Sequence, residues 1–215
     1  MAIRRLAGRN ALIGRASYRF GKYVDSNPDN SFFKRRLNAL RSPFQPAMGF
    51  GDVLEVAQAL REAGLKFWFA GGWGIDILVG QQSRDHQDLD IVVEDYRHAE
   101  PASCRALAQL GFGHRETKAG GIWMPSVTAL SDWSGRRIEI LEVDWDLFAT
   151  NSDLVVSEEV GVAAGELREL AFTEGVIFDN KLPCLTRRAQ LLFHTEFTLT
   201  EKHRRDLDFL KESRD

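Results

Sequence analysis

The chain has 215 residues, of which 44% are hydrophobic and 27% are charged, a composition typical of a globular protein with a hydrophobic core. No apolar run is long enough to span a bilayer, and the arginine-rich N-terminus lacks the uncharged apolar segment of a secretory signal. The two cysteines lie far apart without metal-ligand spacing, which favours a reducing, cytoplasmic setting.

Residues 1–48 form a basic N-terminal arm, with ten Lys or Arg and two Asp, although the net charge of the whole chain is −3. The stretch "DSNPDNS" at 25–31 predicts a loop, and "FFKRRLNAL" at 32–40 predicts a short helix. Basic runs usually mark solvated surface, and no aromatic-basic RNA motif is present. Binding of nucleic acid by the arm is therefore left open but not favoured.

The first helix of the core is expected just after the arm. Asp52, with Glu55 three residues later, has the pattern of an N-cap with a capping box. Gly64 is a typical C-terminal stop. The apolar positions between them fall on one helical face: Val53, Val56, Ala57 and Leu60.

The rest of the chain alternates between helical and strand patterns. The expected elements, in order, are a strand at 65–70, a Gly-Gly turn, a helix at 73–80, a strand at 88–93, a helix at 101–111, strands near 122–131 and at 136–143 joined by "DWSG", and helices at 186–197 (capped by Thr186) and 200–213. Residues 146–185 give no readable pattern. We therefore expect an α+β fold, a small mixed sheet with flanking helices, divided into the arm, a core at 49–145 and a C-terminal segment at 146–215 that ends in two helices.

Two aspartates stand one residue apart in the predicted strand "DLDIVV". Residues i and i+2 of a strand point to the same face, so Asp88 and Asp90 project together, about 6 to 7 Å apart at the backbone. Two convergent carboxylates pack poorly in a core but bind hard cations well, and Mg²⁺ commonly takes one or two carboxylates plus substrate phosphates. A strand edge with both acids in water is the alternative, which the following Ile-Val-Val disfavours.

Gly71 and Gly72 lie between a predicted strand and a predicted helix. Backbone N–H groups at such a junction, with the positive end of the helix, can bind phosphate oxygens. Arg84 and His86 add donors in the loop before the aspartates. A Gly-Gly turn alone is weak support, and Arg84 and His86 alone are typical of a surface loop.

A third carboxylate is expected on the strand "RRIEILEV". Next to the aspartates it would complete a metal site and accept the proton of an attacking hydroxyl. Glu139 and Glu142 lie on opposite faces of this strand, with Asp144 beyond, and periodicity does not choose between them.

The stretch "FAGGWGIDILVGQQSRDHQDLDIVV" resembles the nucleotide-binding motif of the antibiotic nucleotidyltransferases of the lincosamide and aminoglycoside-2″ type, in the DNA polymerase beta superfamily. The Gly-Gly-Trp, Asp76, Gly80, Arg84, His86 and Asp-x-Asp positions match. "LSDWSGRRIEIL" is similar to the family's strand-turn-strand, which selects Glu139 as the third acid. "LPCLTRRAQLLFHTEFTLTEKHRRDLDFL" is similar to its C-terminal helical segment, so the resemblance covers residues 52–212. Glu139 stands where the family usually has Asp, and Leu141 where some members carry His.

The resemblance implies a polymerase-beta-like fold and an enzyme that transfers a nucleoside monophosphate from an NTP, with ATP as the expected donor, to a hydroxyl of a small acceptor. Asp88 and Asp90 would hold two Mg²⁺ ions, and Glu139 would share one of them and act as the base or orient the acceptor hydroxyl. The nucleotide would be bound by Gly71, Gly72, Trp73, Arg84 and His86. The alternatives are a non-catalytic, antitoxin-like nucleotide-binding module and a nucleotidyltransferase that acts on RNA or protein.

Overall fold

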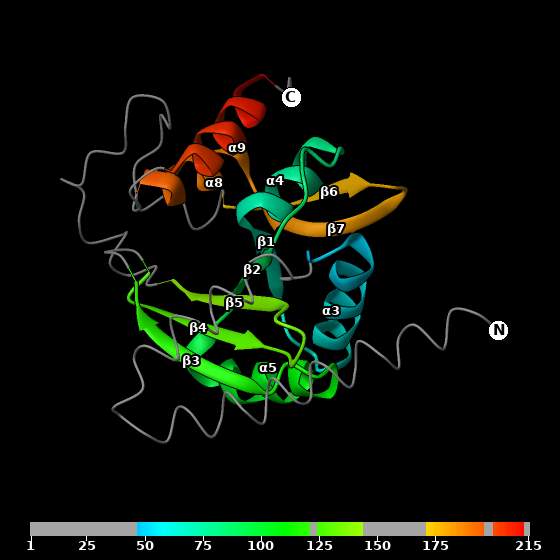
Figure 1. Cartoon of the computed structure of the whole chain (residues 1–215), viewed down its shortest axis with the longest axis vertical. Coiled ribbons are helices and arrows are strands. Elements are labelled where there is room, and N and C mark those ends of the chain that lie inside the picture. The colour runs from blue at the N-terminus through cyan, green and yellow to red at the C-terminus, as the bar shows by residue number, and fades with distance from the viewer. Residues whose placement is uncertain (1–46, 121–123, 144–170, 196–199, 213–215) are drawn as a thin grey trace.

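The computed structural model describes residues 47–120, 124–143, 171–195 and 200–212, and its centre is a seven-stranded mixed sheet (Figure 1). The strand order is β3-β4-β5-β2-β1-β7-β6. The strands are β1 (Phe67–Ala70), β2 (Asp88–Val93), β3 (His114–Ala119), β4 (Ser126–Ser131), β5 (Arg137–Glu142), β6 (Phe172–Ile177) and β7 (Asn180–Leu185). The helices are α3 (Phe50–Glu62), α4 (Gly71–Val79), α5 (Tyr96–Gln109), α8 (Arg187–Thr195) and α9 (Glu201–Glu212).

The centre of the sheet is formed by β5, β2 and β1. Strand β2 pairs parallel with β5 and antiparallel with β1, and β1 pairs parallel with β7. The remaining neighbours are antiparallel, so the sheet is mixed, as the sequence predicts. Strand β2 spans the residues that the sequence predicts.

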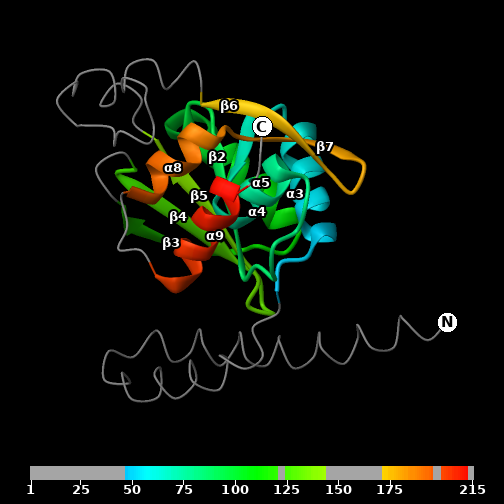
Figure 2. The same ribbon diagram turned by 90° about the horizontal axis from the view of Figure 1, so that it is seen from above.

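Two apolar clusters cover the two faces of the sheet. On one face α3 and α5 pack against the alternate residues Leu89, Ile91 and Val93 of β2. On the other face Ala189 and Phe193 of α8 pack with Val92. Figure 2 shows α3 on one side of the sheet and the C-terminal helices α8 and α9 on the other. The expected α+β architecture with flanking helices is confirmed.

Helix α3 begins two residues earlier than its expected cap, so the assignment of Asp52 as N-cap is wrong. Gly49 is the N-cap, and Asp52 is the third helical residue. Its Oδ2 accepts a hydrogen bond of 2.8 Å from the backbone N–H of Gly49. Asp52 is therefore the acidic partner of a capping box whose cap residue is Gly49. An acid near the start of a helix is typical of both positions, so the sequence alone does not distinguish the two. The apolar face and the stop at Gly64, which has φ +70°, are as predicted.

Two further helix starts differ from prediction. Helix α4 begins at Gly71, so the glycine pair forms its first turn instead of a separate turn before it. Helix α5 begins at Tyr96 and contains Pro101, which the sequence places at the helix start. Thr186 caps α8 as expected, since its Oγ1 accepts a hydrogen bond of 3.4 Å from Ala189 N.

Most of the basic arm lies outside the described residues, as do 144–170. Of the arm, Ala47 and Met48 are described, and Met48 is buried and pairs with His86 through a 2.7 Å backbone hydrogen bond. Among the described helices none is both long and apolar enough to cross a membrane.

Candidate active site

Strands β2 and β5 bring the three predicted acids together on one face of the sheet. In the parallel pairing of these strands Asp90 lies opposite Glu139, and Asp88 lies opposite Arg137. Paired residues of adjacent strands point to the same face, so the three carboxylates share it. All three line one pocket of about 250 Å³.

Glu142 lies on the opposite face from Glu139, as the strand period requires. It accepts a hydrogen bond of 2.8 Å from Arg97 Nε on α5 and is also bonded to Ser126. The pocket lining includes Glu139 and not Glu142. The geometry therefore favours Glu139 as the third acid of the site, although its role in catalysis stays a prediction.

The first turn of α4 forms the wall of the pocket opposite the acids. Ala70, the last residue of β1, is the strand partner of Asp90, which brings the next residue, Gly71, directly against that carboxylate. Gly71 has φ +56°, and an added Cβ would overlap Asp90 Oδ2 and lie 3.0 Å from its Cγ. Gly72 also has no room for a side chain, because a Cβ there would overlap the His86 ring. Glycine at both positions brings the helix N-terminus close to the carboxylates.

Two cations neutralise part of this acidic group. Lys202 Nζ on α9 lies 3.1 Å from Asp88 Oδ1, and Arg137 Nη2 lies 2.6 Å from Glu139 Oε1. Among the described residues, no side-chain hydrogen bond or ion pair to Asp90 is found. Burial, with repulsion from Asp88 and Glu139, raises the pKa of Asp90 well above its usual range. The site therefore has one carboxylate more than its cations compensate.

The donor set fits a hard divalent cation whose coordination is completed by a ligand. Its groups are carboxylate oxygens, which Mg²⁺ prefers, and Asp90 forms no ion pair within the described part of the chain. No group of three or more His, Cys, Asp or Glu among the described residues is arranged to hold a metal ion on its own. Asp88, Asp90 and Glu139 are the candidate ligands of such a cation, with substrate phosphates supplying further oxygens.

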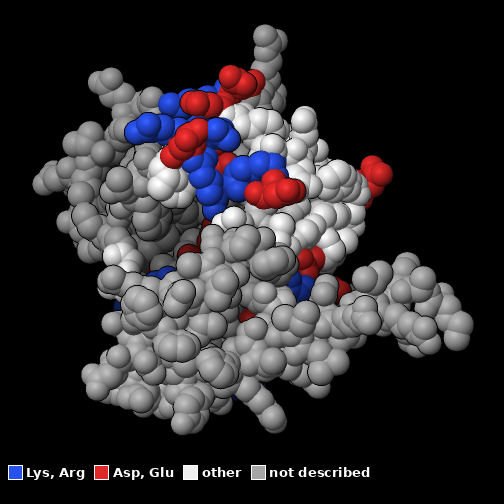
Figure 3. All heavy atoms as spheres, viewed as in Figure 1, with Lys and Arg blue, Asp and Glu red and all other residues white. Residues whose placement is uncertain are grey.

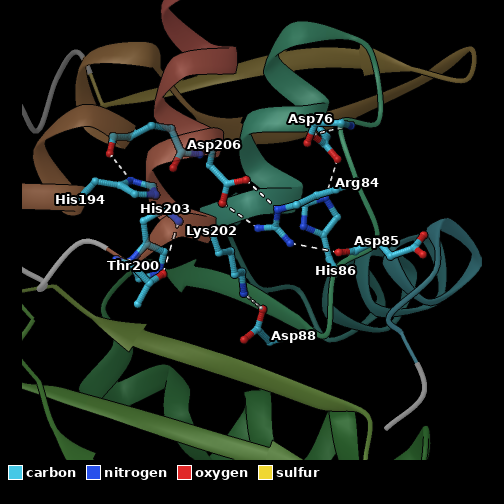
Figure 4. A network of polar contacts seen from close by, with 12 residues as sticks. Asp76, Arg84, Asp85, His86, Asp88, His194, Thr200, Lys202, His203 and Asp206 are labelled. Atoms are coloured by element: carbon cyan, nitrogen blue, oxygen red, sulfur yellow. Dashed lines mark hydrogen bonds and ion pairs between the residues drawn. The ribbon is translucent and has the colours of Figure 1, made fainter. Parts of the chain in front are cut away.

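Trp73 and His86, two of the predicted nucleotide-binding residues, lie behind the pocket and are each 1% exposed. Trp73 Nε1 donates a 3.0 Å hydrogen bond to Met48 O. His86 Nε2 lies 2.5 Å from Oδ2 of the buried Asp76, whose Oδ1 accepts bonds from Ser83. The contact of His86 with Asp76 fastens the 80–87 loop to α4 (Figure 4). Neither Trp73 nor His86 lines the pocket.

Arg84 links the same loop to the C-terminal helix. Its Nε and Nη2 donate hydrogen bonds of 2.7 and 2.6 Å to the two carboxylate oxygens of Asp206, which is 3% exposed. A further bond of 3.0 Å runs from Nη1 to Asp85 O (Figure 4). The pair holds α9 beside the first turn of α4, since Arg84 Nη2 lies 2.8 Å from where a Cβ of Gly72 would stand.

The sequence reasoning missed the part of the pocket that α8 and α9 supply. Their lining residues are Phe193, His194, Lys202, His203 and Asp206. His194 Nδ1 lies 2.7 Å from Gln190 O, so this nitrogen carries the proton and Nε2 is left as an acceptor. Burial lowers the pKa of His194 and favours this neutral form. The spacing of Lys202 and Asp206, four residues apart, is that of any surface ion pair on a helix and gave no signal of a site.

The fold is the polymerase-beta-like fold of nucleotidyltransferases, and in it paired aspartates and a third acid on neighbouring strands face a helix N-terminus built from glycines. Residues 52–210 match the family described as aminoglycoside-2″-adenylyltransferase. The chain belongs to this family. It is an enzyme that transfers a nucleoside monophosphate from an NTP to a hydroxyl group, and enzymes of this class generally use a divalent metal.

Two relatives extend this result. A lincosamide resistance protein from Staphylococcus haemolyticus is 31% identical over 146 residues, which cover 67% of this chain and 83% of the relative. The crystal structure of the lincosamide antibiotic adenylyltransferase LnuA with lincomycin bound is similar, with a TM-score of 0.57 and 26% identity. The match covers 79% of this chain and all of LnuA.

Proposed function

We propose that the enzyme transfers AMP from ATP to a hydroxyl of a small antibiotic, with a lincosamide as the first candidate acceptor. The observation that carries the proposal is the convergence of Asp88, Asp90 and Glu139 opposite the N-terminus of α4. The helix N-terminus provides N–H groups and positive potential for the triphosphate, and the acids provide the ligands for its metal.

In the proposed reaction the acceptor oxygen forms a bond to the α-phosphorus of ATP. The bond from that phosphorus to the bridging oxygen of the β-phosphate breaks, pyrophosphate leaves, and the hydroxyl proton passes to a base. Two Mg²⁺ ions, when bound by Asp88 and Asp90, would neutralise charge on the phosphate oxygens. The chain's own contribution is then to place the acceptor hydroxyl in line with the α-phosphate.

Glu139 is the proposed base. It stands beside Asp90 in the sheet, on the pocket face, and its side chain is one-quarter exposed, so an acceptor can reach it. Its partner Arg137 lies 2.6 Å away, but Nε and Nη2 of this arginine make no hydrogen bond of good geometry among the described residues. Glu139 can thus turn to a hydroxyl without breaking a well-formed bond, and its extra methylene relative to Asp lengthens its reach.

Apolar side chains form a second wall of the pocket and support an amphipathic acceptor. They are Met124, Val127, Leu141 and Phe193. The names of two relatives, one of them structurally similar, concern lincosamides. The family's description makes an aminoglycoside the second candidate. Acidic and basic side chains intermix along α9, and Figure 3 shows red and blue side by side in the upper part of this face, so a small acceptor fits it better than RNA does.

The test is a transfer screen with the purified chain, Mg²⁺ and each of the four NTPs in turn. The acceptors are a lincosamide, an aminoglycoside, a simple sugar and tRNA, and mass spectrometry detects the nucleotidylated product. We expect ATP-dependent modification of the lincosamide that is lost in Asp88→Asn. Nucleotide binding without transfer to any acceptor would favour the non-catalytic nucleotide-binding module. Transfer to tRNA alone would overturn the proposal that the acceptor is a small molecule.

A further inference from the structure

We propose that Lys202 is the side chain that binds the nucleotide's phosphates, and that it leaves Asp88 when metal and nucleotide arrive. The inference rests on the proposed function and concerns the same pocket. Lys202 is the second residue of α9, and its Nζ lies 3.1 Å from Asp88 Oδ1. Both side chains remain part-exposed, at 38% and 31%, so the lysine is free to move to a ligand.

No other Lys or Arg of the described residues lines the pocket. Arg84, the cation that the sequence suggested for this role, already donates three hydrogen bonds, two of them to the Asp206 carboxylate. Arg137 is ion-paired with Glu139 outside the pocket lining. A triphosphate placed between the glycine turn and the acids therefore meets one side-chain cation of the described chain, which is Lys202.

The counter-ion of Asp88 changes when ligands bind: it is Lys202 in the free protein and a divalent cation in the nucleotide complex. A divalent cation on Asp88 would stand close to the Lys202 ammonium, and two like charges at that separation repel. The lysine's flexible four-carbon stem lets the ammonium swing to the phosphate oxygens while the helix stays in place. Lys202 thus pairs with the Asp88 carboxylate in the metal-free enzyme and binds the phosphates in the enzyme that holds metal and nucleotide.

The rest of α9 is fixed in a way that suits this exchange. Asp206 lies one turn after Lys202, lines the same pocket, and is held by the two-pronged bond to Arg84 (Figure 4). Thr200 Oγ1 accepts a hydrogen bond of 3.5 Å from His203 N at the start of the helix. The Asp206–Arg84 pair thus holds α9 in place and the Thr200 cap stabilises its first turn, so only the side chain of Lys202 needs to move.

The test is Lys202→Met, which keeps the length of the side chain and removes its charge. Mn²⁺ alone should bind up to about fivefold more tightly, because Asp88 has lost its competitor and part-exposed pairs are this weak. ATP with Mg²⁺ should bind about tenfold to a hundredfold more weakly. Calorimetry measures both. Arg205→Met is the control, because Arg205 lies on the same helix in an exposed pair with Glu201 and should change neither affinity.

A second measurement uses the unmodified protein. Lysine acetylation, mapped by mass spectrometry, should become faster at Lys202 with Mn²⁺ alone and slower with ATP and Mg²⁺. Lys66, an exposed lysine paired with Glu94, should not respond. A purely structural pair would not give these opposite changes, and a Lys202 that ignores both ligands overturns the inference.

The outcomes separate the two proposals. Wild-type protein that binds no nucleotide overturns the proposed function together with this inference. Wild-type binding of ATP that Lys202→Met leaves unchanged overturns the role of Lys202 alone. Weaker ATP binding without tighter Mn²⁺ binding overturns the exchange at Asp88.

Discussion

Gly71→Ala tests the close approach of the α4 N-terminus to the acids. The residue has φ +56°, and an added Cβ would overlap Asp90 Oδ2. The left-handed conformation costs a non-glycine residue roughly 1–2 kcal/mol, and overpacking adds roughly 1–3 kcal/mol. We therefore expect the free energy of unfolding to fall by roughly 2–5 kcal/mol. Transfer should be lost, because the added methyl group pushes the Asp90 carboxylate away from the first turn of α4, where the triphosphate is proposed to bind.

Gly64→Ala is the matched control, since Gly64 has φ +70° and nothing within 4 Å of an added Cβ. It should show the conformational cost alone, with transfer unchanged. Urea denaturation without metal measures stability, and the lincosamide assay measures transfer. In the double variant Gly71→Ala/Asp90→Ala most of the steric cost should disappear, because only the Cβ of residue 90, 3.3 Å from the added Cβ, remains in close contact. A Gly71→Ala enzyme with wild-type turnover would refute the proposed contact between helix and carboxylate.

The remaining predictions concern the three acids. Asp88→Asn and Asp90→Asn should each abolish transfer while circular dichroism shows a folded protein; near wild-type turnover in either would remove it from the metal site. Because the pKa of Asp90 is raised, the folded metal-free protein binds its proton more tightly than the unfolded chain does. The free energy of unfolding should thus fall as pH rises from about 3.9 through the raised pKa, and Asp90→Asn should remove that fall. If wild type and Asp90→Asn, both in EDTA, show the same pH dependence of the unfolding free energy, the assignment is contradicted. Glu139→Gln should reduce turnover by about 10²–10⁴-fold with little change in ATP affinity, whereas Glu139→Asp should stay active and Glu142→Gln should resemble wild type; a dead Glu142→Gln enzyme would place the base on the other face.

The parts of the site that follow from a short local pattern could be predicted. Strand β2 has a period-2 pattern, so both the strand and the shared face of Asp88 and Asp90 could be inferred from six residues. The choice of Glu139 came from family resemblance, because two acids three apart look alike until the strand's buried face is known. The pairing of β5 with β2 now shows why Glu139 faces the pocket.

The parts that depend on tertiary packing could not be predicted. Strand β3, "HRETKA", is an exposed edge strand without apolar alternation, so nothing marked it as a strand. Strands β6 and β7 lie in a stretch whose period is broken by Gly175 and Pro183. Lys202 lies in a helix rich in charged residues, and the sequence around it is typical of a solvent-exposed helix face. Only the docking of α9 brings it to Asp88.

The like charges on β2 are compensated in part, and the remainder indicates how the site works. Lys202 forms an ion pair with Asp88, and Arg137 forms one with Glu139. Asp90 forms no ion pair among the described residues and instead holds its proton more tightly. Replacing Asp90 with a neutral residue would relieve this repulsion, so the ionised form of Asp90 costs stability in the metal-free protein. A metal-bound nucleotide supplies the missing positive charge through its metal and gives Lys202 a new anionic partner in its phosphates. The ligand therefore relieves the repulsion and releases the lysine in the same event, which couples metal and nucleotide binding more strongly than either ligand's own contacts would.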